Sequence, residues 1–418
     1  MRIKRDKYLQ QLISRKHSGM IKIISGIRRC GKSYLLNELF RGHLLEAGVR
    51  EEQVISISLD DYEQIRFRDP EVLYPYVTER LKGEGMHYLL LDEVQMLGEF
   101  ESVLNGLMRR SNLDIYVTGS NSRFLSSDVV TEFRGRGEEI RVYPLSFAEY
   151  CGARSYGEGD WLRAWKEYSV YGGMPLVLSY EDDMQKEAYL RSLMRETYIK
   201  DIVERNHIRN SEELEELVDM IASGIGGLTN AAKLERRFMS EKHVSLSAPT
   251  IRQYLDDMQD AFIIDKSKRY DIKGKRYINT PCKYYMADMG LRNARLDFRQ
   301  TDMPHIMENV VYNELTMRGY RVDVGEVKCS GKNSGSTEVD FVVNLGSSRY
   351  YIQSAWALPD AEKMAQEKRS LLSIHDSFRK MIIVGDAIAS YQDQDGVLIV
   401  SLVDFLLHSE RLERLFQF

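Results

Sequence analysis

The chain has 418 residues, 43% hydrophobic and 29% charged, which predicts a globular protein of roughly two to four domains. Its 58 Lys and Arg against 63 Asp and Glu give a net charge of −5, which excludes a polybasic nucleic-acid binder and confines any nucleic-acid surface to a local patch. There is no apolar run near about 18 residues, no apolar segment behind the basic N-terminus and no C-x-x-C pair, so we expect a cytoplasmic protein without membrane span, secretory signal or zinc site.

Residues 26–33 match the phosphate-binding P-loop pattern G-x-x-x-x-G-K-[ST]. A short apolar run at 20–24 precedes them and a helical pattern at 34–40 follows, so a strand, a glycine loop and a helix stand in the order that phosphate binding needs. We expect Lys32 to bridge the β- and γ-phosphates and the Ser33 hydroxyl to ligate Mg²⁺. The predicted nucleotide-binding residues are Gly26, Ile27, Arg28, Arg29, Cys30, Gly31, Lys32, Ser33 and Tyr34.

Two carboxylates follow a second apolar run, at 87–91, and complete the expected site. Asp92 would hold Mg²⁺ through water, and Glu93 would orient and deprotonate the attacking water. An acidic strand end on its own is equally typical of an ordinary loop. The prediction of catalysis at these two residues therefore depends on the P-loop upstream.

Three further residues are candidates for contact with the γ-phosphate. Ser120 and Asn121 follow the strand pattern at 114–118, where a sensor of the γ-phosphate would lie, although Gly, Ser and Asn also build ordinary turns. Arg136 is the candidate arginine finger, against the alternative of a solvated loop. The two arginines inside the P-loop could contact phosphate, an acidic neighbour or only solvent.

Strand and helix patterns alternate through the first third of the chain. The strand patterns lie at 20–24, 54–60, 87–91 and 114–118, and a helical pattern such as 100–110 lies between two of them. Alternation of this kind predicts an α/β fold, with a parallel sheet flanked by helices on both faces.

Several segments together resemble a large family of prokaryotic AAA-superfamily ATPases whose C-terminal region has long been labelled a domain of unknown function. The segments are IKIISGIRRCGKS at 21–33, LLLDEVQ at 89–95, VTGSNS at 117–122, GRGEEIRVYPLSFAEY at 135–150, YGGMP at 171–175 and YIKDI at 198–202. The resemblance continues into the last third and so covers nearly the whole chain. It implies an AAA-type P-loop ATPase domain at 1–152 that uses ATP and Mg²⁺.

The middle of the chain divides into two predicted parts. Residues 153–230 are rich in Glu, Leu, Lys and Arg and predict a helical lid or connector. At 231–298 the family resemblance implies a winged helix-turn-helix, with a recognition helix near Thr250 and a wing that turns at Gly274. The basic residues of this wing are Lys266, Lys268, Arg269, Lys273, Lys275 and Arg276. They suit a DNA backbone, but a solvated hairpin or a protein-binding winged helix fits the same pattern.

Residues 299–418 resemble the PD-(D/E)xK nuclease core, an α/β fold of the restriction-endonuclease type. The matching residues are Glu308 on a helix, Asp340 on a strand and Gln353 on the next strand. In an active member the two acids hold Mg²⁺ and a lysine two residues after the third position orients water, but this chain has Ala355 there. Because losing such a charge-stabilising group greatly lowers the catalytic rate, we expect this domain to be a structural or binding relic. A migrated lysine such as Lys363 would instead restore nuclease activity.

These predictions combine into an ATPase that couples its nucleotide state to a C-terminal half facing DNA or a protein partner, which could be a second copy of the chain. Two alternatives remain open. One is a slow nucleotide-dependent switch that acts as a regulator or scaffold. The other is an ATP-regulated DNA nuclease, against which Ala355 is the main objection.

Overall fold

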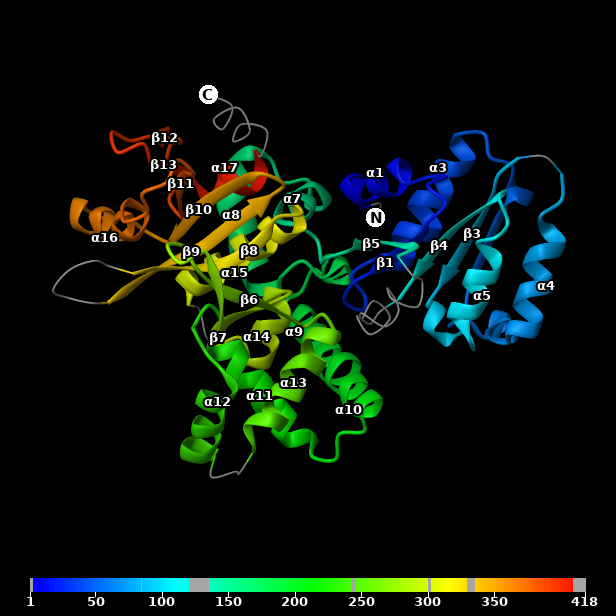
Figure 1. The fold of residues 1–418 in the computed structure, drawn as a ribbon, viewed down its shortest axis with the longest axis horizontal. Coiled ribbons are helices and arrows are strands. Elements are labelled where there is room, and N and C mark those ends of the chain that lie inside the picture. Colours follow the sequence, from blue (N-terminus) through cyan, green and yellow to red (C-terminus); the bar gives the residue numbers. More distant parts are fainter. Residues whose placement is uncertain are drawn as a thin grey trace. The chain divides into compact units, whose positions relative to one another are not determined.

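The computed structural model describes residues 3–83, 85–119, 135–242, 246–299, 302–328 and 335–408 (Figure 1). The chain divides into two compact units. Unit 1 comprises Met1–Pro144 with Asp260–Phe262, and unit 2 comprises Leu145–Gln259 with Ile263–Phe418. In the described parts of both units, no helix combines the length and the apolar character needed to cross a bilayer.

Unit 1 is built on a five-stranded sheet in which every strand pair is parallel. The strand order is β2-β3-β4-β1-β5. The bounds are β1 Ile21–Ser25, β2 Val54–Ser58, β3 His87–Asp92, β4 Leu113–Thr118 and β5 Gly137–Arg141. This order places the last residues of β1, β3 and β4 next to one another at one edge. The expected α/β fold with a parallel sheet is therefore confirmed.

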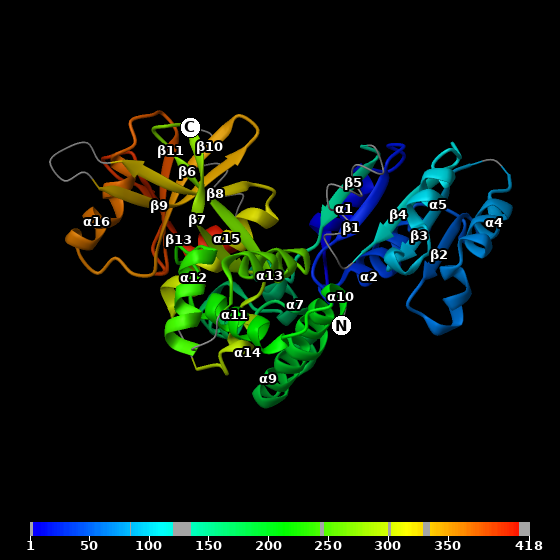
Figure 2. The same cartoon turned by 60° about the horizontal axis from the view of Figure 1, so that its bottom comes forward.

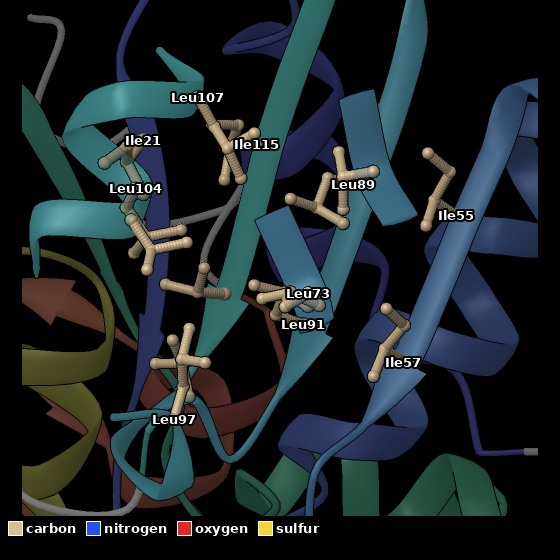
Figure 3. Packing of buried hydrophobic residues seen from close by; sticks show 14 of the residues in the cluster. Ile21, Ile55, Ile57, Leu73, Leu89, Leu91, Leu97, Leu104, Leu107 and Ile115 are labelled. Atoms are coloured by element: carbon tan, nitrogen blue, oxygen red, sulfur yellow. The ribbon is translucent and has the colours of Figure 1, made fainter. Parts of the chain in front are cut away.

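Helices cover both faces of this sheet because successive strand residues point to opposite faces. On one face, Ile21, Leu89, Leu91 and Ile115 pack with α4 and α5 in a single apolar cluster (Figure 3). On the other face, Phe40 stacks on Tyr116 with ring centroids 4.4 Å apart. The helical elements are α1 Asp6–Ser14, the continuous run α2 Lys32–Tyr34, η1 Leu35–Phe40 and α3 Arg41–Glu46, then η2 Glu51–Gln53, η3 Tyr62–Arg68, α4 Pro70–Arg80, η4 Val94–Met96 and α5 Phe100–Leu107.

Unit 2 begins with a series of helices. They are α7 Phe147–Arg154, η6 Glu158–Asp160, α8 Trp161–Tyr171, η7 Pro175–Ser179, α9 Asp183–Ser192, η8 Leu193–Ile199, α10 Lys200–Asn206, α11 Ser211–Ser223, α12 Ala231–Arg237, η9 Phe238–Lys242 and α13 Ala248–Asp260. A hairpin of β6 Ile264–Asp271 and β7 Arg276–Met286 follows α13. Helices followed by a basic hairpin agree with the order of elements expected from the sequence, while the identity of this region as a winged helix stays a prediction.

The hairpin continues into the C-terminal sheet. β6 pairs in parallel with β8, so that Arg269 lies beside Val324, and Figures 1 and 2 show the hairpin next to β8. The eight strands run in the order β12-β13-β11-β10-β9-β8-β6-β7. The predicted boundary between residues 298 and 299 thus separates segments that share one sheet. The remaining bounds are α14 Met289–Arg295, α15 Met303–Met317, β8 Arg321–Lys328, β9 Ser336–Leu345, β10 Ser348–Ala355, α16 Ala361–Leu372, β11 Arg379–Val384, β12 Tyr391–Gln392, β13 Leu398–Ser401 and α17 Leu402–Leu407.

A buried carboxylate joins two distant segments of unit 2. Asp288 precedes α14 and accepts hydrogen bonds from the backbone N–H of Gly173 at 2.6 Å and of Leu291 at 3.0 Å. A Cβ atom on Gly172 would lie 2.2 Å from Asp288 Oδ1, and one on Gly290 would lie 2.1 Å from the Tyr171 carbonyl oxygen. Burial raises the pKa of Asp288 to about 6, although these backbone hydrogen bonds favour its ionised form. The two glycines therefore permit a contact that larger residues would prevent.

We expect Asp288→Asn to destabilise the protein by about 1–3 kcal/mol, because an amide NH₂ would face one of two buried N–H donors and leave it without an acceptor. Asp360→Asn is the matched control. Asp360 caps α16 through one hydrogen bond, to the Lys363 N–H, and Asn caps helices as well as Asp does. Urea denaturation of both variants measures the difference, and equal stability of the two would contradict this account of Asp288.

Candidate functional site

The P-loop connects β1 to α2 and depends on backbone conformations that suit glycine. Gly26 has φ +135° and Gly31 has φ +101°, and Arg29 between them also has a positive φ, of +62°. A Cβ atom on Gly26 would lie 2.0 Å from the carbonyl oxygen of Val142. The loop therefore needs glycine at position 26 for space as well as for conformation.

Lys32 lies across this loop. Its side chain is buried, and Nζ donates hydrogen bonds to the carbonyl oxygens of Gly26 at 2.9 Å and Ile27 at 3.0 Å. The helix that begins at Lys32 also has N–H groups at its N-terminus that lack partners within the helix, so the ammonium group and these donors gather around the same loop. Such a concave set of donors is suited to an anion.

The other residues of the predicted nucleotide-binding set fall into two groups. Ile27 and Cys30 are buried, and the Cys30 thiol donates to the Val142 carbonyl at 3.4 Å, so these two side chains anchor the loop from inside. Arg29 and Ser33 are exposed, while Arg28 and Tyr34 are half-buried. The solvent-facing side chains are therefore those that a ligand could reach.

Asp92 lies at the end of β3, next to the start of the P-loop helix. Its carboxylate is 3% exposed and accepts a hydrogen bond from the Thr118 hydroxyl, and the Ser33 hydroxyl lies near enough to favour its ionised form. The Asn37 amide lies 3.5 Å from its second oxygen, and Asn37 itself accepts from Ser56 at 3.0 Å. Burial raises the pKa of Asp92, and the two hydroxyls lower it. The structure thus brings Ser33 and Asp92, the two predicted magnesium ligands, together.

Glu93 follows in a left-handed conformation, with φ +54°. Its backbone N–H donates to Thr118 Oγ1 at 2.9 Å, while the same hydroxyl donates to Asp92. Its carboxylate accepts from the Gln95 amide. Thr118 therefore sets the positions of both acidic residues from the neighbouring strand.

Sequence reasoning did not assign Thr118 or Asn37 to the site. Each had a signal that could have identified it. Thr118 is the last residue of a strand pattern parallel to the one that ends at Asp92, and parallel strands end at the same edge. Asn37 lies four residues after Ser33 and so occupies the same face of the helix.

The sensor and arginine predictions have different outcomes. Ser120 and Asn121 lie outside the described residues. Arg136 immediately precedes β5, and its carbonyl oxygen accepts from the Ile21 N–H at 2.9 Å. In the parallel pairing of β1 with β5, Arg141 lies beside Ser25, where the P-loop begins. Since five strand residues span about 16 Å, the structure does not bring Arg136 to the P-loop of its own chain.

The residues matching a nuclease core do lie together in unit 2. The Asp340 N–H donates to Gln353 Oε1 at 3.4 Å, and Lys283 Nζ lies 2.8 Å from Glu308 Oε1 and 3.6 Å from Asp340 Oδ1. Lys363, the candidate for a migrated lysine, instead pairs with Glu367 on its own helix, α16, at 2.6 Å. The lysine among these acids thus comes from β7, a strand that sequence reasoning assigned to the wing.

The predicted basic set on the hairpin is divided by its ion pairs. Arg269 pairs with Glu326 at 2.8 Å, Arg276 lies 3.7 Å from Asp271 Oδ2, and Lys273 Nζ donates to the Lys328 carbonyl at 2.7 Å. The exposed lysines that remain are Lys266, Lys268 and Lys275. The acids therefore offset part of the charge of the two arginines, whereas Lys273 keeps its charge because its partner is a neutral carbonyl.

Comparison with protein families identifies residues 18–151 as an AAA domain and residues 162–302 as a domain of unknown function, DUF8612. Among solved structures, this chain is similar to the ORC1 protein of Aeropyrum pernix in complex with DNA, at 13% identity over 71% of this chain and 93% of that one, with a TM-score of 0.32. Cdc6p from Pyrobaculum aerophilum is similar at 13% identity over 73% and 94% of the two chains, with a TM-score of 0.30. Likenesses this distant support no argument about function.

Curated relatives cover much more of the chain at higher identity. An uncharacterised protein of Methanocaldococcus jannaschii, MJ1544, is 26% identical over 90% of this chain and 82% of its own length. An uncharacterised protein of Haemophilus influenzae is 34% identical over 97% of this chain and 98% of its own length. With that identity over almost the full length of both, this chain belongs to one family with the H. influenzae protein, and its residues 18–151 match an AAA domain.

Proposed function

We propose that this protein binds ATP with Mg²⁺ and hydrolyses it to ADP and phosphate. The observation that carries the proposal is the meeting of Ser33, Asp92 and Glu93 at the edge of the sheet where the P-loop begins. A serine hydroxyl beside a buried carboxylate is a set of hard oxygen donors, which fits Mg²⁺. When bound, Mg²⁺ would neutralise charge that develops on the phosphates.

Each residue then has one task. Lys32 would exchange its two carbonyl partners for phosphate oxygens of the nucleotide, and Ser33 and Asp92 would hold the cation. Glu93 accepts the proton of a water molecule whose oxygen attacks the γ-phosphorus, and the bond from this phosphorus to the β,γ-bridging oxygen breaks. Thr118 is a positioning residue, because it acts through Asp92 and Glu93.

For Glu93→Gln we expect ATP binding to persist while turnover falls about 10²–10⁴-fold, because the amide cannot accept the proton. Glu99→Gln is the matched control, since Glu99 is exposed and follows the same strand. Lys32→Ala should abolish ATP binding itself. Phosphate release and fluorescent-nucleotide titration measure the two quantities. Wild-type turnover in Glu93→Gln would remove Glu93 as the base.

Thr118→Val should lower turnover about 5–30-fold with little change in the KM for ATP, because it removes the hydroxyl between Asp92 and the Glu93 backbone and leaves shape almost unchanged. Thr118→Ser keeps the hydroxyl and should retain most activity. Steady-state kinetics with both variants tests this role. A loss in Thr118→Ser as large as in Thr118→Val would show that the methyl group matters instead.

We further propose that unit 2 carries the surface to which the nucleotide state is coupled, and that this surface contacts DNA. The exposed Lys266, Lys268 and Lys275 on the hairpin favour DNA over a purely structural role. If each neutralises one phosphate, the logarithm of the binding constant should fall with the logarithm of salt concentration with a slope of roughly −3. A slow nucleotide-dependent switch would show little turnover and no stimulation by DNA.

Replacing these three lysines with alanine should reduce the magnitude of the salt slope by roughly 3, while replacing the exposed Lys82, Lys166 and Lys200 removes the same charge elsewhere and should leave it near the wild-type value. Fluorescence anisotropy with a labelled duplex at several salt concentrations gives both slopes. Equal slopes in the two triple variants would exclude the hairpin as the DNA contact.

A further inference from the structure

Lys283 is a buried lysine at the centre of three carboxylates. Its side chain is 3% exposed on β7, and Nζ lies 2.7 Å from Glu338 Oε1, 2.8 Å from Glu308 Oε1 and 3.6 Å from Asp340 Oδ1. The carboxylates come from α15 and β9, so the lysine connects three elements. The Tyr285 hydroxyl donates to the same Glu308 oxygen at 2.7 Å.

The charges of this cluster depend on one another. Burial lowers the pKa of Lys283, but the carboxylates of Glu308, Asp340 and Glu338 raise it by more, so the ammonium stays charged. Burial, together with the charge of Glu308, raises the pKa of Asp340 to about 7. Buried carboxylates this close need a cation among them, because unpaired buried charge is strongly destabilising.

A divalent cation does not fit this arrangement. A nuclease core would hold such a cation between Glu308 and Asp340, where the Lys283 ammonium lies. Asp340 also uses its other oxygen, Oδ2, to accept the Ser354 N–H at 2.9 Å.

We propose that the Lys283 ammonium is a tethered substitute for a divalent cation. It supplies a positive charge among Glu308, Glu338 and Asp340 from within the chain, so the C-terminal sheet keeps its structure without a metal. The same contact fastens β7 of the hairpin to α15 and β9. The position and rigidity of the hairpin therefore depend on Lys283.

The direct test replaces Lys283 with methionine, which has similar bulk and no charge. In nucleotide-free wild-type protein, neither EDTA nor Mn²⁺ should change the unfolding temperature of this unit. Lys283→Met should unfold roughly 5 to 15 °C lower, and Mn²⁺ should restore much of the loss by binding the vacated carboxylates. Adding Asp340→Asn to Lys283→Met should abolish this rescue. A folded Lys283→Met protein that ignores Mn²⁺ would overturn the proposal.

A second measurement does not depend on the folding of that variant. Electron paramagnetic resonance counts Mn²⁺ bound to nucleotide-free wild type and to Asp340→Asn, and any Mn²⁺ at the P-loop contributes equally to both. Equal binding supports a site already filled by Lys283. Binding that requires Asp340, or Mn²⁺-dependent DNA cleavage that Lys283→Met abolishes, would instead make Lys283 part of a working nuclease site and refute the substitution.

Discussion

The parallel alignment of β1, β3 and β4 is the constraint on which the nucleotide site depends. Because these strands run in one direction and are neighbours, their last residues meet at a single edge of the sheet. The P-loop leaves β1 there, Asp92 ends β3 and Thr118 ends β4. One hydroxyl, that of Thr118, then joins the side chain of Asp92 to the backbone of Glu93. The site is therefore held by the sheet itself rather than by loops alone.

The sequence predicts the parts of this site that lie in short, continuous segments. Residues 26–33 and the pair Asp92 and Glu93 are identifiable because spacing along the chain determines their geometry. Thr118 and Asn37 depend on which strand lies next to which, and no single segment reports this. The position of Arg136 is likewise hidden from the sequence. Only the strand register reveals that it precedes β5 at the end of the strand away from the P-loop.

Unit 2 shows how distant pairing changes the meaning of a local pattern. The basic residues at 266–283 form a hairpin, as expected, but the hairpin also belongs to the C-terminal sheet. Its members therefore have three environments: exposed side chains, ion pairs with acids such as Glu326, and the buried cluster around Lys283. Position 355 lacks the lysine of the nuclease pattern. Lys283 lies far from that position in the sequence, and only the fold places it among the acids of the pattern.

The close approach of Gly26 to the Val142 carbonyl also joins the P-loop to the last residues of unit 1. Val142 donates its N–H to Ser25 at 2.8 Å, accepts the Cys30 thiol, and stands two residues before Pro144, where unit 1 gives way to unit 2. The backbone at Val142 thus contacts Gly26 of the P-loop and lies close to the end of unit 1. A side chain at position 26 would therefore displace the backbone at Val142 as well as the loop itself.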